Sequence, residues 1–260
     1  MDDRLSQTIE ALLASHEPAD LHRGLELVKQ EISRVGSEDA GALFERVSTL
    51  FYIDPLDRPD LAPLLNEAVA LVVGFGKWVI PALLHDLDDS DLKAHIVIAN
   101  VLGRLGADAV APLMAQYQSA PDSARCQFVL YALGKIKSPK VVQAAALAIE
   151  AAEGEDRELR DTATRAIGKF VESIPAAGLP ENIGRRFVDV LQKNLGDRSP
   201  AIRAKAVRSL GKLAKYGHLT TDERQILRRT FEHLLGKDER FEWDRAYLVR
   251  KEAAEAMAYL

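Results

Sequence analysis

Residues 202–213 read IRAKAVRSLGKL, and the centre of this stretch has three close copies upstream. The copies are NVLGRLG at residues 100–106, YALGKIK at 131–137 and RAIGKFV at 165–171. In each copy a glycine follows a large apolar residue and precedes a basic residue and a second large apolar residue. The four glycines are separated by 31, 34 and 43 residues. Repetition at this period predicts an architecture of stacked structural units.

Alignment on the glycine shows that neighbouring positions repeat as well. A fifth copy has Ala258 in the glycine position, 47 residues after the fourth glycine. The position before the glycine is always apolar, and so is the position two after it; the first set is Leu102, Leu133, Ile167, Leu210 and Met257, and the second is Leu105, Ile136, Phe170, Leu213 and Leu260. Apolar residues spaced three to five apart form one stripe on a helix. The repeat therefore contains an amphipathic helix.

A second apolar, helix-like run precedes each of these helices. The runs cover residues 79–87, 109–117, 141–152, 183–195 and 223–235. Turns containing Asp and Ser, such as DRSP at 197–200, join the two helices, and these residues are good helix N-caps. A single helix pair cannot bury its apolar stripe, so neighbouring pairs must cover it. The glycine is explained by close helix contact, where a Cβ atom would hold the neighbouring helix away.

The sequence therefore predicts an all-α protein, an α-solenoid of stacked antiparallel helix pairs behind an irregular N-terminal cap. The array is expected over residues 77–260, with about five repeats at 78–106, 107–137, 138–174, 180–217 and 220–260. The cap is expected over residues 1–76, with less regular helices at 3–15, 20–35, 39–51 and 61–73. No segment has the strict alternation of a half-buried strand.

These columns resemble HEAT repeats, in particular the short HEAT-like variety named after the phycobilisome lyases. That consensus runs Val-Arg, two variable residues, Ala-Ala, a variable residue, Ala-Leu-Gly, a variable residue, and Ile or Leu. Residues 202–213 match it at nearly every position, residues 249–260 match apart from Ala258, and the resemblance covers about residues 78–260. It implies a solenoid in which the second helix of each pair lines the inner, concave surface.

The resemblance also implies a ladder of Asp and Arg side chains between neighbouring repeats, with Asp six residues before Arg. Asp197 with Arg203 and Asp244 with Arg250 have this spacing. In the first repeat only the Asp of the pair is present, because Asp89 lies six residues before His95 and not before an Arg. Further changes come mid-array, where the pairs at this spacing are Ala120 with Cys126 and Gly154 with Arg160. We therefore expect the ladder to be interrupted there.

Composition limits the class of protein. Apolar residues make up 47% of the 260-residue chain and charged residues 28%, which argues against wholesale disorder. The single cysteine, Cys126, excludes an internal disulfide and favours a reducing compartment. The acidic start MDDRLSQ lacks the pattern of a secretion signal, and the apolar run at 68–84 is interrupted by Gly, Lys and Pro. The expected location is the cytoplasm, without membrane insertion.

Charge is distributed unevenly along the chain. The net charge is −5 overall, −10 over residues 1–121 and +6 over residues 122–220. Two columns four residues apart, and so on one helix face, carry all the candidate partner-binding residues, which are Arg104, Tyr131, Lys135, Arg165, Lys169, Arg208 and Lys212. These side chains form either a positive groove for a partner or a solvated column that keeps the helices soluble.

The preferred function is a non-enzymatic scaffold or adaptor that binds an acidic protein surface or peptide on its concave face. One alternative is a bilin-lyase-like enzyme or enzyme subunit. Another is a nucleic-acid-binding protein related to alkylated-DNA glycosylases, which the negative net charge disfavours. The C-terminal end of the array could also join copies of the chain.

No catalytic residue, cofactor or metal site is predicted. The stretch HDLDDSDLKAH at 85–95 is rich in Asp and His, but it lacks the glycine of a calcium-binding loop, and helix capping explains its aspartates. Cys126 lies in the arginine column and is expected to be a small core residue.

Overall fold

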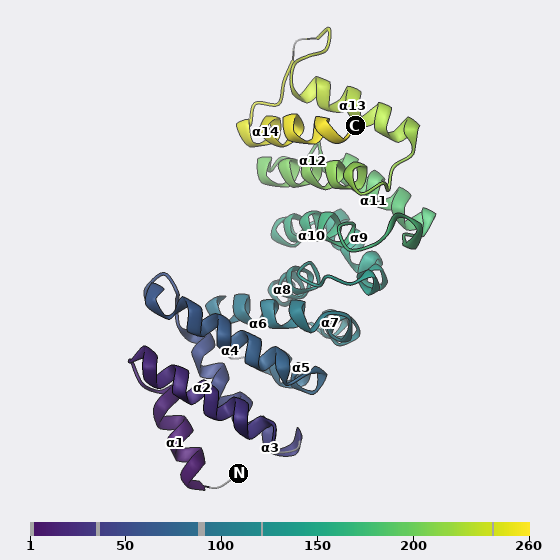
Figure 1. Ribbon diagram of the computed structural model, residues 1–260. Helices are drawn as coiled ribbons and strands as arrows, with labels where there is room; N and C mark the ends of the chain where they lie inside the picture. The colour runs from purple at the N-terminus through teal and green to yellow at the C-terminus, as the bar shows by residue number, and fades with distance from the viewer. Residues whose placement is uncertain (1–2, 35–36, 88–91, 121, 241) are drawn as a thin grey trace. The chain divides into compact units, whose positions relative to one another are not determined.

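The computed structural model describes residues 3–34, 37–87, 92–120, 122–240 and 242–260. These residues form helices joined by short turns, and no strand occurs among them beyond an isolated bridge between Leu235 and Trp243. The prediction of an all-α solenoid of helix pairs is confirmed (Figure 1). The chain divides into two compact units, residues 1–112 and 113–260. The cap boundary drawn after Gly76 from the sequence is a different division and stays a prediction.

The first unit consists of helices that pack around a continuous apolar core. They are α1 (Asp3–Leu13), α2 (Pro18–Ile32), α3 (Ser37–Ser48), α4 (Ala62–Gly74), α5 (Ile80–His85) and α6 (Leu92–Leu105), with 3₁₀ turns at η1 (Thr49–Tyr52), η2 (Pro59–Leu61), η3 (Lys77–Val79) and η4 (Gly106–Ala109). Leu25, Phe44 and Leu102 are among its fully buried side chains. The four helices expected in residues 1–76 are all present, each within a few residues of its predicted bounds.

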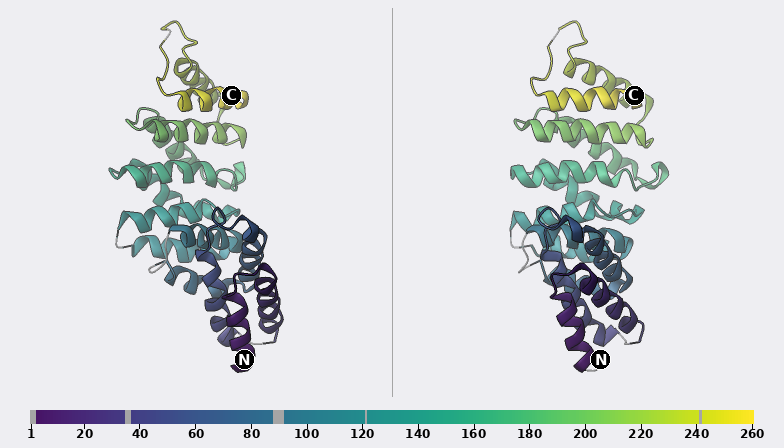
Figure 2. Two further views of the ribbon diagram at one scale, coloured as in Figure 1. Left: turned by 90° about the vertical axis from the view of Figure 1, so that its left-hand side faces the viewer. Right: turned by 60° about the vertical axis from the view of Figure 1, so that its left-hand side comes forward.

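The second unit is the regular part of the array. Its elements are α7 (Val110–Gln118, which begins just before the unit), α8 (Ser123–Leu133), η5 (Pro139–Ala144), α9 (Ala145–Glu153), α10 (Arg157–Phe170), η6 (Ala176–Gly178), α11 (Glu181–Asn194), α12 (Pro200–Lys215), α13 (Thr221–Leu234), α14 (Tyr247–Ala256) and η7 (Met257–Tyr259). The second helices of the pairs, α8, α10, α12 and α14, pack in that order. They lie side by side in Figures 1 and 2.

The apolar columns of the repeat form the core of this unit. Leu133, Ile167 and Leu210, each one residue before the glycine, are fully buried, and so are Phe170 and Leu213. Asp122 caps α8 and Asp156 caps α10 by accepting backbone N–H bonds, as N-cap carboxylates do. The sequence pattern and the turn residues thus specify the same helix pairs.

Two of the repeated glycines allow neighbouring second helices to approach closely. A Cβ atom on Gly168 of α10 would lie 2.9 Å from Ser209 Cβ of α12, and one on Gly211 of α12 would lie 2.7 Å from Ala256 Cβ of α14. Both distances are too short for carbon atoms in contact. Glycine is therefore required by packing at these two positions, as the sequence predicts.

One helical stretch among the described residues, Lys93–Gln118, is long and apolar enough to cross a membrane. It includes α6, η4 and α7, and 44% of its most apolar window is buried inside the protein. Ile98 and Leu102 within it are core side chains. Core helices of soluble proteins pass the same test of length and composition, so we assign this stretch to the core of the repeat fold.

Candidate functional site: the basic face of the second helices

Six of the seven predicted partner-binding residues lie on one face of the second unit. Three second helices, α8 with the turn that follows it, α10 and α12, contribute two each, four residues apart, which places the two on the same side of the helix. We call this set the basic face: Tyr131 and Lys135 near the end of α8, Arg165 and Lys169 on α10, and Arg208 and Lys212 on α12. The seventh, Arg104, is an exposed residue at the end of α6 in the first unit.

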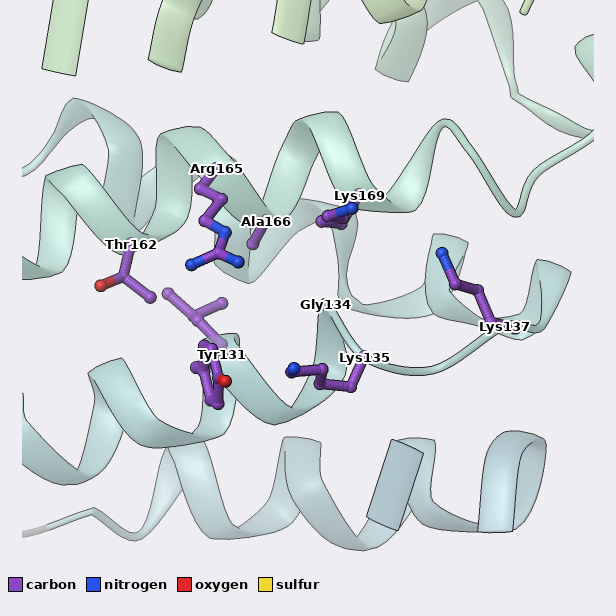
Figure 3. A pocket seen from close by; sticks show the side chains of 9 residues that line it. Tyr131, Gly134, Lys135, Lys137, Thr162, Arg165, Ala166 and Lys169 are labelled. Atoms are coloured by element: carbon purple, nitrogen blue, oxygen red, sulfur yellow. The ribbon is translucent and has the colours of Figure 1, made fainter. Parts of the chain in front are cut away.

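A small hollow opens between α8 and α10 on this face. It has a volume of about 150 Å³ and is lined by Leu130, Tyr131, Gly134, Lys135, Lys137, Thr162, Arg165, Ala166 and Lys169. Figure 3 shows Arg165 extending from α10 toward Tyr131, with Lys135 beside the same ring. We call this space the Tyr131 hollow.

Two cations share the ring of Tyr131. Lys135 Nζ lies 5.0 Å from the ring centroid, and Arg165 Cζ lies 5.7 Å from it. Both distances are within the range of cation–π attraction. Among the described residues, neither Lys135 nor Arg165 forms an ion pair with a carboxylate. Their positive charges are therefore held in place by the aromatic ring and are not neutralised.

The other two lysines of the basic face, Lys169 and Lys212, pair with a residue that sequence reasoning missed. Glu172, two residues after α10, lies 3.1 Å from Lys169 Nζ and 2.6 Å from Lys212 Nζ. It also accepts a hydrogen bond of 3.0 Å from Lys137 Nζ. These lysines come from three successive repeats, so Glu172 connects the repeats, and its single negative charge offsets one of their three positive charges.

The surroundings of Glu172 keep its carboxylate ionised. Its side chain is only 14% exposed. Burial alone would raise the pKa of Glu172, but the hydrogen bonds from Lys212 and Lys137 outweigh it and lower the pKa to about 2. Burial also lowers the pKa of Lys212, and the contact with Glu172 opposes that shift. At neutral pH the cluster is therefore an ion-paired one.

A second hollow of about 170 Å³ lies between α10 and α12. Its lining is almost entirely cationic, consisting of Arg165, Lys169, Lys205, Arg208, Ser209 and Lys212. Arg208 Nε donates to Glu252 of α14 at 2.8 Å, and Lys205 pairs with Asp161. The hydrogen bond to Glu252 raises the pKa of Arg208. Most cations of this second hollow thus have carboxylate partners, unlike the pair at Tyr131.

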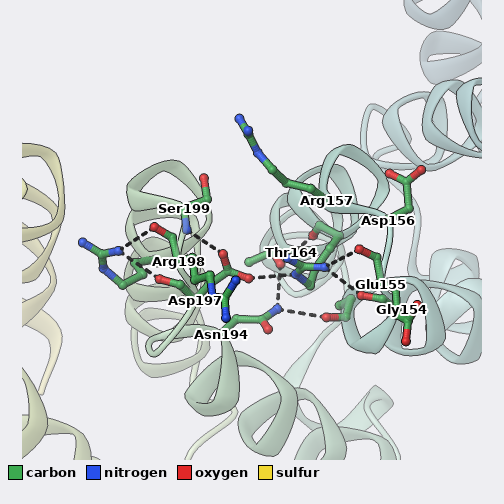
Figure 4. Close-up of polar contacts among 12 residues, drawn as sticks. Gly154, Glu155, Asp156, Arg157, Thr164, Asn194, Asp197, Arg198 and Ser199 are labelled. Carbon is green, nitrogen blue, oxygen red and sulfur yellow. Dashed lines mark hydrogen bonds and ion pairs between the residues drawn. The ribbon is translucent and has the colours of Figure 1, made fainter.

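The Arg–Asp ladder begins one repeat earlier than the sequence spacing indicates. Arg160 Nη1 donates to the Gly154 carbonyl at 2.8 Å, and Arg160 Nε donates to Asp197 Oδ2 of the next repeat at 2.8 Å. Figure 4 shows Asp197 and Gly154 among these contacts. The expected break at Arg160 is therefore wrong. A main-chain carbonyl accepts from the arginine at this position, so replacing Asp by Gly there loses nothing in this contact.

The next steps of the ladder repeat this geometry. Arg203 Nη1 donates to the Asp197 carbonyl at 2.9 Å, and its Nε and Nη2 donate to the two carboxylate oxygens of Asp244 at 2.7 and 2.8 Å. Arg250 Nη1 donates to the Asp244 carbonyl at 2.7 Å. Burial opposes ionisation of Asp244, but the bonds from Arg203 and the Ala246 N–H lower its pKa. Arg160 and Arg203 therefore each fix their own helix turn and bind the Asp of the following repeat, and Arg250 makes the first of these contacts.

A buried polar network lies beside the ladder. Asn194 donates to the Thr164 hydroxyl at 2.9 Å and to the Ala152 carbonyl at 3.1 Å (Figure 4). The Ser209 hydroxyl donates to the Thr164 carbonyl at 2.9 Å. Because buried polar groups are costly unless paired, these bonds fix the positions of α9, α10, α11 and α12 relative to one another.

The other residues considered in the sequence analysis, Cys126 and His95, contact main-chain carbonyl groups of their own repeats. Cys126 is partly buried with its Sγ 3.9 Å from the Tyr117 carbonyl, and burial raises its thiol pKa. His95 Nε2 lies 3.2 Å from the Leu87 carbonyl. Asp89 and most of the acidic run around it lie outside the described residues. Within the described ranges, no three His, Cys, Asp or Glu side chains gather so that they could hold a metal ion.

A family model for the HEAT repeat matches residues 187–217, which cover most of α11 and all of α12. This stretch of the chain therefore matches one HEAT repeat. The array is similar in fold to a chain of the complex of CpcE and CpcF of phycocyanin lyase from Nostoc sp. PCC7120, at 19% identity and a TM-score of 0.54. That alignment covers 68% of this chain and 97% of the other.

The chain is also similar in fold to an archaeal HEAT-like repeats protein from Thermococcus onnurineus NA1, at 16% identity and a TM-score of 0.52. This alignment covers 98% of this chain and 96% of the other. Comparison of the sequence with curated proteins gives no match. At such identities the two structural likenesses show the fold alone.

Proposed function

We propose that this repeat protein is a non-enzymatic scaffold that binds an acidic protein surface or peptide on its basic face. The resemblance to HEAT arrays assigns this face to the inner, concave side. The observation that carries the proposal is the pair of cations at Tyr131, Lys135 and Arg165, which have no carboxylate partner among the described residues. Charges already oriented but not neutralised are available to an incoming anion.

The composition of the face fits protein recognition. Tyr and Arg are enriched at protein interfaces because they combine apolar area with polar groups. An array whose helices are fixed by the ladder loses little conformational entropy on binding. Two carboxylates of the protein itself, Glu172 and Glu252, pair with cations of the basic face, and Asp161 pairs with the neighbouring Lys205. A phosphate polymer would meet repulsion from these carboxylates, whereas a short acidic segment can contact the unneutralised cations alone.

The test measures binding of fluorescein-labelled hexaglutamate by fluorescence anisotropy. The double variant Lys135→Glu/Arg165→Glu should lose binding, because both unneutralised cations are reversed. The matched control is Lys140→Glu/Lys193→Glu, which changes the net charge equally at exposed residues of η5 and α11, away from the second helices. Equal binding by the two double variants would refute the proposal. Binding of DNA that weakens steeply with salt would favour the nucleic-acid alternative.

The enzyme alternative, a bilin-lyase-like activity, is tested separately. Formation of a coloured adduct on incubation with a bilin and its acceptor protein would support it, and would show that the basic face is part of an enzyme or enzyme subunit. No catalytic residue of this chain is assigned to such a reaction.

A further inference from the structure

The size of the Tyr131 hollow limits what can enter it. An apolar cavity of about 150 Å³ holds a molecule the size of benzene, whereas drug-sized ligands need roughly 300–1,000 Å³. The Tyr131 hollow has about 150 Å³. It therefore accommodates one side chain of a partner and not a folded segment or a cofactor.

The hollow has an apolar base and a cationic rim. Leu130 and Ala166 lie beneath its floor and are almost completely buried, so the half-buried Tyr131, Gly134 and Thr162 form the apolar surface open to a ligand. Lys135 and Arg165 stand at the rim on either helix (Figure 3). A ligand that satisfies both parts has a short apolar stem that ends in an anion.

Gly134 differs from the other repeated glycines in a way that bears on this hollow. A Cβ atom there would meet Lys169 Cβ at 3.6 Å, which is ordinary contact, whereas Cβ atoms at Gly168 and Gly211 would collide with the next helix. The backbone of Gly134 has φ of −66°, which any residue adopts. Neither packing nor conformation requires glycine at this position. What its missing side chain provides is open space in the hollow.

Resting on the proposed function, we propose that the Tyr131 hollow binds a single glutamate side chain of the acidic partner. The two methylene groups pack over Gly134 beside the Tyr131 ring and the Thr162 side chain, and the carboxylate lies between Lys135 Nζ and the Arg165 guanidinium. The lysines nearby do not compete for it, because Lys137 and Lys169 are bound to Glu172. An aspartate reaches the same cations only by leaving part of the apolar base uncovered.

The test compares hexaglutamate with hexaaspartate, which have equal charge and differ by one methylene per residue. One buried methylene contributes enough to make hexaglutamate bind about threefold to fivefold more tightly. Gly134→Leu and, independently, Thr162→Phe should fill the hollow without changing charge. Both should abolish this preference, while weak charge-driven binding of both peptides remains. The matched control Gly196→Leu places the same side chain on an exposed turn and should keep the preference.

Circular dichroism and thermal unfolding show which filled variant is folded, and either one suffices for the comparison. Equal affinity of the unmodified protein for the two peptides would overturn the inference, and so would a preference that survives filling of the hollow. In both cases the proposed function stands if the Lys135→Glu/Arg165→Glu variant has lost binding. If neither peptide binds the unmodified protein, the proposed function fails as well.

Discussion

Glu172 accepts an ion pair of 2.6 Å from Lys212, a side chain of the following repeat. The same carboxylate binds Lys137 and Lys169, so one acidic residue holds three lysines that would otherwise be free. Part of the positive charge of the basic face is therefore used within the protein. This division of the charge leads to the first two predictions.

Replacing Glu172 with Gln should strengthen binding of acidic peptides. The variant keeps the size of the side chain but releases the charge of three lysines toward the face. We expect the Kd for hexaglutamate to fall by about tenfold, as for one close charge contact of about 1.4 kcal/mol. Fluorescence anisotropy measures the change. Weaker binding would mean that Glu172 positions the lysines for the ligand and does not compete with it.

The same replacement should lower stability in a pH-dependent way. The pKa of Glu172 is about 2 in the folded protein and ordinary in the unfolded chain. A lowered folded pKa stabilises the protein above the unfolded value, and this contribution is lost as the pH falls toward 2. At pH 7 we expect Glu172→Gln to lower the free energy of unfolding by about 2–3 kcal/mol. Urea unfolding at pH 7 and at decreasing pH should show the difference from the unmodified protein shrink below about pH 5.

Loss of a ladder arginine should destabilise the second unit. Arg203→Ala removes two bonds to Asp244 and leaves that mostly buried carboxylate without its guanidinium partner. The expected cost is about 3–5 kcal/mol in the free energy of unfolding. The double variant Arg203→Ala/Asp244→Ala should cost less than the sum of the two single changes, because they remove one interaction. Additive costs in urea unfolding would contradict this coupling.

The repeated glycines should respond differently to alanine. Gly168→Ala drives a methyl group into Ser209 and should cost about 1–3 kcal/mol in the free energy of unfolding. Gly134→Ala meets only ordinary contacts and should be close to neutral. Thermal unfolding of the two variants measures the contrast. Similar shifts in Tm for both would mean that the close approach of α10 and α12 does not depend on glycine.

Much of the fold can be predicted from the sequence because the same apolar and turn positions recur in each repeat. The buried positions of Leu133, Ile167 and Leu210 follow from their shared column. Glu172 could not be found in this way, because it occurs in one repeat only and its partners are three side chains far apart in the chain.

The ladder and the hollow show a second limit. Spacing within one repeat identifies Asp197 and Arg203 as ladder residues. It does not reveal that Arg160 binds Asp197, or that the partner of each arginine within its own repeat is a main-chain carbonyl, which Gly154 supplies for Arg160. The Tyr131 hollow depends on how α8 and α10 are placed against each other, which a single column of residues does not specify. Contacts between repeats therefore need the structure.

Gly168 of α10 lies against Ser209, and one repeat later Gly211 of α12 lies against Ala256 in the same way. The surfaces that α10 and α12 present to their successors are thus chemically alike. A duplicated helix pair could be inserted between two repeats, or one removed, without creating a new type of contact between second helices. The number of units in such an array can therefore change while the contacts between neighbouring second helices stay the same.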